Sequence, residues 1–326
     1  MYSTKLHIYQ IFSNLWYKIF KLYNLSMRNL YTKFVKFLEI CKQFSKDLVA
    51  EKGNILRPGP VPRFSDLEVI AMSMAAESEE IDSENWLFEA RLKECKDSIP
   101  NLISRRLFND RRKAVSNLQE KIRSRMAEEI DGVKTTSDSR PIEVCRVARG
   151  KCCKMGRNGD FAKTPDFGYC ASQGCYLFGY KLHALCGLSG VIHSYDLSKA
   201  SVHDIHYIKD IKTIYHDCCI IGDKGYIGVE RSNLTCSKQQ TPGSNVHTDS
   251  IKRIGSLLFL HLQKARKRIE TMFSQLNDLF LVIRNNAKNT SGLFAGIIGK
   301  VSALTALQYI NYISNKPIGR IKYALI

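Results

Sequence analysis

The sequence predicts an α/β protein in which a mixed sheet flanked by helices follows an all-α amino-terminal region. Three observations support this fold class. Apolar residues recur at helical spacing up to about residue 130. From about residue 131 the pattern changes to the period-two alternation of strands, and an apolar helical stripe returns near residue 262. A length of 326 residues is sufficient for about two domains.

The amino-terminal region reads as a series of helices. Residues 30–50 place apolar side chains at three- and four-residue spacing. A loop is expected at residues 57–62, because three prolines there remove backbone donors and favour extended backbone. Ser65 and Glu68 then have the spacing of a capping box, which predicts a new helix. Further helical stretches are expected over residues 84–95 and 111–130.

The second region alternates strands and helices. From Tyr176 to Cys186, apolar residues alternate with Gly179, Lys181 and His183, which predicts a strand with one buried face. The turn at residues 187–190 makes a β-hairpin with the segment that follows. A helix over 201–215, a short buried strand over 218–223, and an apolar-striped helix over 262–283 complete the expected mixed sheet with its helices. Residues 293–313 are expected to form a buried terminal helix.

The chain is strongly basic. It has 49 Lys and Arg against 31 Asp and Glu, a net charge of +18 and an isoelectric point near 9.4. Such a balance favours a polyanionic partner, either nucleic acid or an anionic membrane surface, with an acidic protein as a third option. Basic residues cluster between residues 101 and 125. We interpret this cluster as a cationic face that contacts the DNA backbone, in preference to an ordinary solvated helix surface. The cluster consists of Arg105, Arg106, Arg111, Arg112, Lys113, Lys121, Arg123 and Arg125.

Membrane and disulfide classes are disfavoured. The apolar segments over residues 8–25 and 293–313 are interrupted by charged and polar side chains, so no membrane span is expected. Residues 1–26 are interpreted as a leader or a translational extension, with Met27 as an alternative start. The eleven cysteines are expected to be reduced thiols, and the absence of any C-x-x-C pair makes a zinc site a weak hypothesis.

Three carboxylates are the candidate catalytic residues. A protein that cuts phosphodiesters must neutralise developing negative charge, and two divalent metals held by carboxylates are a common solution. Asp138 lies in an extended segment, where the alternative is a turn aspartate. Asp223 follows a short apolar strand, and Glu270 borders the buried stripe of its helix, where the alternative is a pair with Arg266. Asp204 is interpreted as a helix cap and is left out of the metal set.

Taken in order along the chain, the motifs around these carboxylates resemble those of the DDE transposases of bacterial insertion sequences, and among them the insertion-sequence family numbered nine-eight-two. The resemblance covers nearly the whole chain after about residue 30. Its motifs are Gly59 to Glu68, Asp82 to Asn85, Ser104 to Arg106, Asn109 to Arg112, Ser137 to Pro141, Gly179 to His183, Ala200 to Asp204, Gly222 to Tyr226, and Arg266 with Glu270.

The resemblance implies a helical DNA-binding region over residues 1–130 and a ribonuclease-H-like catalytic domain over residues 131–326 with carboxyl-terminal helices. It implies two Mg²⁺ or Mn²⁺ ions held by Asp138, Asp223 and Glu270. In related families the helix that bears the Glu has Tyr and Lys where this chain has Gln263 and Asn277, so no base-gripping role is implied for these two residues.

The expected function is therefore cutting of transposon ends and their joining to target DNA by two-metal phosphoryl transfer. With this function we also expect a homodimer in the synaptic complex and a location in the bacterial cytoplasm, on the nucleoid. Two alternatives are a metal-dependent nuclease without strand transfer and a transposase descendant that only binds DNA. The expected DNA-binding residues are Arg105, Arg106, Arg111, Arg112, Lys181, His183 and Arg266.

Overall fold

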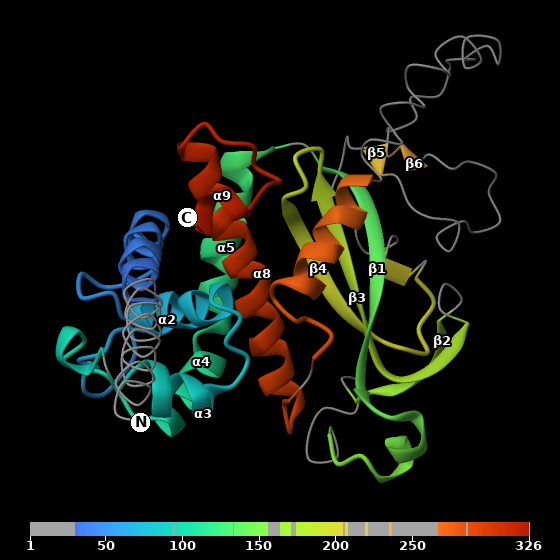
Figure 1. Cartoon of the computed structure of the whole chain (residues 1–326), viewed down its shortest axis with the longest axis horizontal. Coiled ribbons are helices and arrows are strands. Elements are labelled where there is room, and N and C mark those ends of the chain that lie inside the picture. Colours follow the sequence, from blue (N-terminus) through green and yellow to red (C-terminus); the bar gives the residue numbers. More distant parts are fainter. Residues whose placement is uncertain are drawn as a thin grey trace, which may run out of the picture. The chain divides into compact units, whose positions relative to one another are not determined.

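The computed structural model describes residues 30–93, 95–132, 134–155, 164–170, 174–204, 206–207, 219–220, 235–236, 267–284 and 286–325 (Figure 1). The segment expected to be a leader, residues 1–26, lies outside the described residues. By its internal contacts the chain divides into two compact units, Met1–Val115 and Ser116–Ile326.

The described part of the first unit consists of helices and loops. A helix spans residues 30–44. It is followed by α2 (Asp66–Ser78), α3 (Glu84–Trp86), which continues into a π-helical turn at Leu87–Arg91, a 3₁₀ turn at Lys96–Ser98, and α4 (Arg105–Ala114). The predicted capping box is confirmed at the start of α2: the Ser65 hydroxyl accepts from the Glu68 amide, and the Glu68 carboxylate accepts from the Ser65 amide.

The core of the first unit is built around α2. Almost every residue of this helix is buried, including Leu67, Ile70, Met72 and Met74. Because α2 is buried on all sides, neighbouring elements must cover all of it, so α2 is the central helix of this unit and α4 packs against it. The helix expected over residues 111–130 is instead two helices, because the chain leaves the helical conformation at Val115.

The second unit contains a four-stranded sheet. Its strands are β1 (Lys134–Cys145), β2 (Asp166–Cys170), β3 (Cys175–Gly187) and β4 (Ile192–Lys199), with a 3₁₀ segment at Val147–Cys152. β3 is the central strand: β1 pairs along one edge, β2 and β4 pair along the other, and all three pairings are antiparallel. Two short strands, β5 (Cys219–Ile220) and β6 (Thr235–Cys236), form an antiparallel pair. The α/β class is confirmed, and every strand pairing among the described residues is antiparallel.

The predicted hairpin is confirmed as β3–β4, but the expected single buried face of β3 is wrong. Tyr180 on one face lies 6.1 Å, ring centre to ring centre, from Phe294. His183 on the other face is stacked on Tyr207 at 4.8 Å. β3 is paired along both edges and covered on both faces, so both of its alternating sets of side chains are buried.

The second unit also contains helices. They are α5 (Ser116–Ile130), a helix over residues 267–278, α8 (Thr290–Ile313) and α9 (Lys322–Leu325), which packs against α8. α5 packs against α8 and β4 in the second unit, although its residues fall within the region 1–130 for which the sequence predicts DNA binding. α8 is long and apolar enough to cross a membrane by length and composition, yet 83% of its most apolar window is buried inside the structure. It is the buried terminal helix that the sequence predicts.

Candidate catalytic face and basic surface

Asp138 lies in the middle of β1, on the face of the sheet that α8 covers. In the β1–β3 register Asp138 is opposite Ala184, and directly opposed residues of an antiparallel pair project from the same face. Tyr180, which contacts Phe294 of α8, projects from that face too, because it is four residues from Ala184 along β3. We call this face, defined by Asp138, Tyr180 and Ala184, the front face.

The helix that carries Glu270 packs on the front face. Arg140, two residues after Asp138 and thus on the same face, holds its guanidinium carbon 5.5 Å from the ring centre of Phe273. Phe273 is fully buried, and Glu270 lies three residues before it, which places both on neighbouring positions of one side of the helix. Glu270 is exposed whereas Asp138 is half-buried. Two of the three predicted catalytic carboxylates are therefore borne by elements that meet on one face of the sheet, and this helix crosses the sheet in Figure 1.

Of the other residues predicted near this site, Asn277 is among the described residues. Asp223 lies outside the described residues; it follows Ile220 of β5 by three positions, and β5 contacts β1. Arg266 and Gln263 also lie outside the described residues, and Asn277 is half-buried on the helix of Glu270.

Lys181 and His183 share one face of β3, as predicted, but that face is opposite to the one bearing Asp138. Lys181 donates from Nζ to Asp204 Oδ1 and to the carbonyl of Val202, both at 2.9 Å. His183 is buried, with Nε2 2.7 Å from Ser198 Oγ. Both side chains are held by contacts within the unit, which leaves them poorly placed to contact DNA. We call this face, which bears Lys181 and His183, the rear face.

Burial dominates the electrostatics of His183. Desolvation lowers the pKa of its imidazole to about 4, because the charged form loses hydration in the interior. The nearby carboxylates Asp204 and Asp196 act in the opposite direction, and Lys181 adds to the lowering. His183 is consequently neutral near pH 7, and it carries no charge that could attract phosphate.

Asp204 makes side-chain contacts beyond the predicted helix cap, and most of the helix expected over residues 201–215 lies outside the described residues. Its Oδ2 accepts from Ser139 Oγ at 3.0 Å, and its Oδ1 accepts from Lys181 Nζ. The S-x-x-D spacing favours a cap, and local spacing alone gives no sign of a contact with a strand 65 residues away. The sequence feature that could have pointed to a further role for Asp204 is the Ala200-to-Asp204 motif, which is part of the family resemblance.

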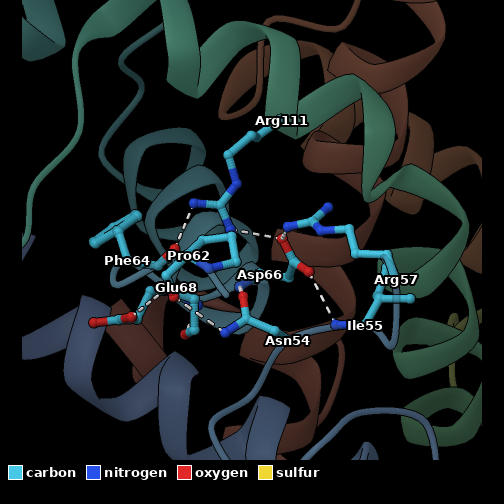
Figure 2. Close-up of polar contacts among 9 residues, drawn as sticks. Asn54, Ile55, Arg57, Pro62, Phe64, Asp66, Glu68 and Arg111 are labelled. Atoms are coloured by element: carbon cyan, nitrogen blue, oxygen red, sulfur yellow. Dashed lines mark hydrogen bonds and ion pairs between the residues drawn. The ribbon is translucent and has the colours of Figure 1, made fainter. Parts of the chain in front are cut away.

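Some basic residues of the predicted DNA-binding face form ion pairs and hydrogen bonds within the first unit instead of facing solvent (Figure 2). Arg111 is buried and donates to Asp66 Oδ1 at 2.6 Å and to the carbonyl of Phe64. Asp66 also accepts from the Ile55 amide at 3.0 Å and from Arg57 at 3.1 Å. A guanidinium buried in this way cannot reach a DNA phosphate. The structure therefore assigns Arg111 to stabilising the loop before α2.

Two other predicted basic residues also have internal partners. Arg112 is paired with Glu84 at 2.9 Å, and the carboxylate of Glu77 lies 3.9 Å away. Arg123, in the second unit, is buried against Glu120 and the carbonyls of Ile192 and His193. These cations lack the exposure of a phosphate-binding side chain.

Within the first unit, Arg105 and Arg106 are the two exposed basic residues of the predicted cluster. They occupy the first turn of α4, whose amino end is capped by the Ser104 hydroxyl through the Leu107 amide. A helix amino terminus carries partial positive charge, and two exposed guanidinium groups add to it. This turn is the part of the predicted basic cluster best suited to bind a phosphate group.

The donor chemistry at the front face suits a hard divalent cation. Asp138 and Glu270 offer carboxylate oxygens, which Mg²⁺ and Mn²⁺ prefer. Among the described residues no three His, Cys, Asp or Glu side chains form a group that could hold a metal ion. The third predicted ligand, Asp223, lies outside the described residues. Eight of the described cysteines are free thiols, and they include Cys170 and Cys175, which oppose each other on β2 and β3.

A protein-family model described as "Transposase DDE domain" matches residues 135–306, from β1 to within α8. The match covers just over half of the chain and includes Asp138, Asp223 and Glu270. The chain belongs to this family. Transposases of this family act on DNA, and DDE domains generally use divalent metal ions, which agrees with the carboxylates of the front face. No curated protein and no solved structure matched the chain.

Proposed function

We propose that this DDE transposase cuts the ends of a bacterial insertion sequence and joins them to target DNA, as the resemblance to the family numbered nine-eight-two implies. The observation that carries the proposal is the placement of Asp138 and Glu270 by elements that meet on one face of the sheet, inside the matched transposase domain. Asp223, also inside that domain, is the proposed third carboxylate.

The proposed catalytic domain is ribonuclease-H-like, with Asp138, Asp223 and Glu270 holding two Mg²⁺ or Mn²⁺ ions. When bound, divalent ions supply activation of the attacking water and stabilisation of the leaving 3′ oxygen. The chain's own carboxylates have a second effect. Three negative side chains repel a phosphodiester, so DNA enters this site only when cations offset their charge. Asp138 is held for this purpose by the Ser139 amide, which donates to its Oδ1 at 2.8 Å.

The proposed contact with the transposon end is the first turn of α4. Arg105 and Arg106 are exposed there, at the positive end of the helix, and the chain as a whole carries a net charge of +18. Phosphate contacts of this kind give affinity without sequence readout. Arg266, four residues before Glu270 in the sequence, is proposed to contact the DNA strand near the cleavage site. We further propose a homodimer in the synaptic complex, and a location in the bacterial cytoplasm on the nucleoid.

The experiment follows cleavage and joining separately. Purified protein is incubated with Mg²⁺, a labelled fragment containing the DNA that flanks its gene, and a supercoiled target plasmid. The proposal expects cuts at the transposon end and covalent transfer of label to the plasmid. Cutting without transfer would favour a metal-dependent nuclease instead, and binding without cutting would favour a protein that only binds DNA.

A further inference from the structure

Ser139 connects the two faces of the sheet. Its amide donates to Asp138 Oδ1 at 2.8 Å on the front face, and its hydroxyl donates to Asp204 Oδ2 at 3.0 Å on the rear face. The proposed metal ligand and Asp204 are thereby joined through one residue of β1. Asp204 belongs to a segment 65 positions further along the chain, so only the fold brings the two together.

Asp204 is itself firmly held. Lys181 of β3 donates to its Oδ1 at 2.9 Å and also to the carbonyl of Val202, two residues before it. The Lys181 and Asp204 side chains are only 17% and 20% exposed, so solvent screens this pair less than a surface ion pair. Lys181 is opposite Pro141 in the β1–β3 register, two residues from Ser139. The contacts therefore tie the segment that carries Asp204 to both β1 and β3.

We infer that Asp204 is a positioning residue for Asp138, acting through Ser139 from the rear face. The inference rests on the proposed function, because it takes Asp138 to be a metal ligand. A carboxylate that binds metal needs a fixed orientation, and loss of an outer hydrogen bond commonly lowers metal affinity or activity 10- to 100-fold. Asp204 orients β1 at the residue that donates to Asp138, and the ion pair with Lys181 holds the Asp204 side chain in place.

The test compares Ser139→Ala and Asp204→Asn with the wild type and with Ser198→Ala. Ser139→Ala removes only the hydroxyl and leaves the amide that donates to Asp138. Ser198→Ala is the matched control: it removes a rear-face hydroxyl that contacts His183 and not β1. Asp204→Asn keeps the size of the side chain while removing its charge. The readouts are Mn²⁺ affinity by calorimetry, thermal melting, and the Mn²⁺ dependence of end cleavage.

We expect Ser139→Ala and Asp204→Asn to weaken Mn²⁺ binding about tenfold, with melting close to wild type and with cleavage partly restored by excess Mn²⁺. Ser198→Ala should bind Mn²⁺ as the wild type does. Wild-type affinity in both Ser139→Ala and Asp204→Asn would overturn the inference while leaving the proposed function intact. Wild-type protein that neither binds Mn²⁺ nor cleaves DNA, or unchanged Mn²⁺ binding in Asp138→Asn, would overturn the proposed function itself and the inference with it.

Discussion

Replacing Arg111 by Met tests the finding that this arginine stabilises the first unit rather than binding DNA (Figure 2). The variant keeps the apolar stem and removes the donors to Asp66 and to the Phe64 carbonyl. Breaking one partner of a buried ion pair costs about 3–5 kcal/mol. Asp66 is fully buried but keeps Arg57 and the Ile55 amide, so we expect a free-energy loss near the lower end, about 3 kcal/mol. That corresponds to a fall of roughly 12–24 °C in the melting temperature of a domain of this size.

Tryptophan fluorescence reports this loss selectively, because both tryptophans of the chain, Trp16 and Trp86, precede Val115. Arg106→Met is the control; its side chain is exposed, and its effect on unfolding should stay within about 0.5 kcal/mol. At a temperature where both variants are folded, Arg106→Met should weaken binding to the transposon end and Arg111→Met should not. This reasoning would be refuted if Arg111→Met had the same melting temperature as Arg106→Met and yet lost binding to the transposon end.

Two further predictions concern the sheet. Burial lowers the pKa of His183 to about 4, so between about pH 6.5 and 4 the imidazole is protonated in the unfolded chain and neutral in the folded chain. The free energy of unfolding should therefore fall as the pH drops through this range, by about 1.4 kcal/mol per pH unit. Urea titrations across this range check it, and His183→Gln should flatten the dependence. A Cβ on Gly179 would overlap the Ile142 carbonyl, so Gly179→Ala should cost about 1–3 kcal/mol or more, whereas Gly132→Ala, which has open space, should be nearly neutral in the same titration.

Local signals explain the parts of the fold that could be predicted. The capping box at Ser65 and the turn after Gly187 depend on residues three or four positions apart, and both are confirmed. The buried helix α8 follows from an apolar run whose polar residues have partners nearby in space, such as Gln308 with the Gly190 carbonyl and Asn311 with the Arg320 carbonyl. Short-range physics and composition are sufficient in these cases.

Local sequence does not predict which charged side chains pair with one another, because the partners are distant in the sequence. Arg111 and Asp66 are 45 positions apart, and a basic run alone does not distinguish an exposed guanidinium from a buried one. Likewise, alternation along β3 shows that Lys181 and His183 share a face. Only the register with β1 shows that Asp138 is on the other face. The sequence predicts which elements carry the carboxylates, and the tertiary fold decides which neighbours they have.

The central claim, that Asp138, Asp223 and Glu270 form one metal-dependent catalytic site, is tested most directly by single amide substitutions. Asp138→Asn, Asp223→Asn and Glu270→Gln are assayed for cleavage of a labelled transposon end at fixed Mg²⁺, beside two matched controls. Glu143→Gln removes an exposed carboxylate from β1, and Asp278→Asn removes one from the helix of Glu270.

We predict that each of the three catalytic substitutions lowers the cleavage rate at least a thousandfold, an order of magnitude typical of a lost electrostatic contact to the transition state. End binding should stay within a few-fold of wild type in all three, and both control variants should cleave normally. Near-normal cleavage in Asp138→Asn, Asp223→Asn or Glu270→Gln, with the controls behaving as expected, would remove that carboxylate from the site and contradict the account.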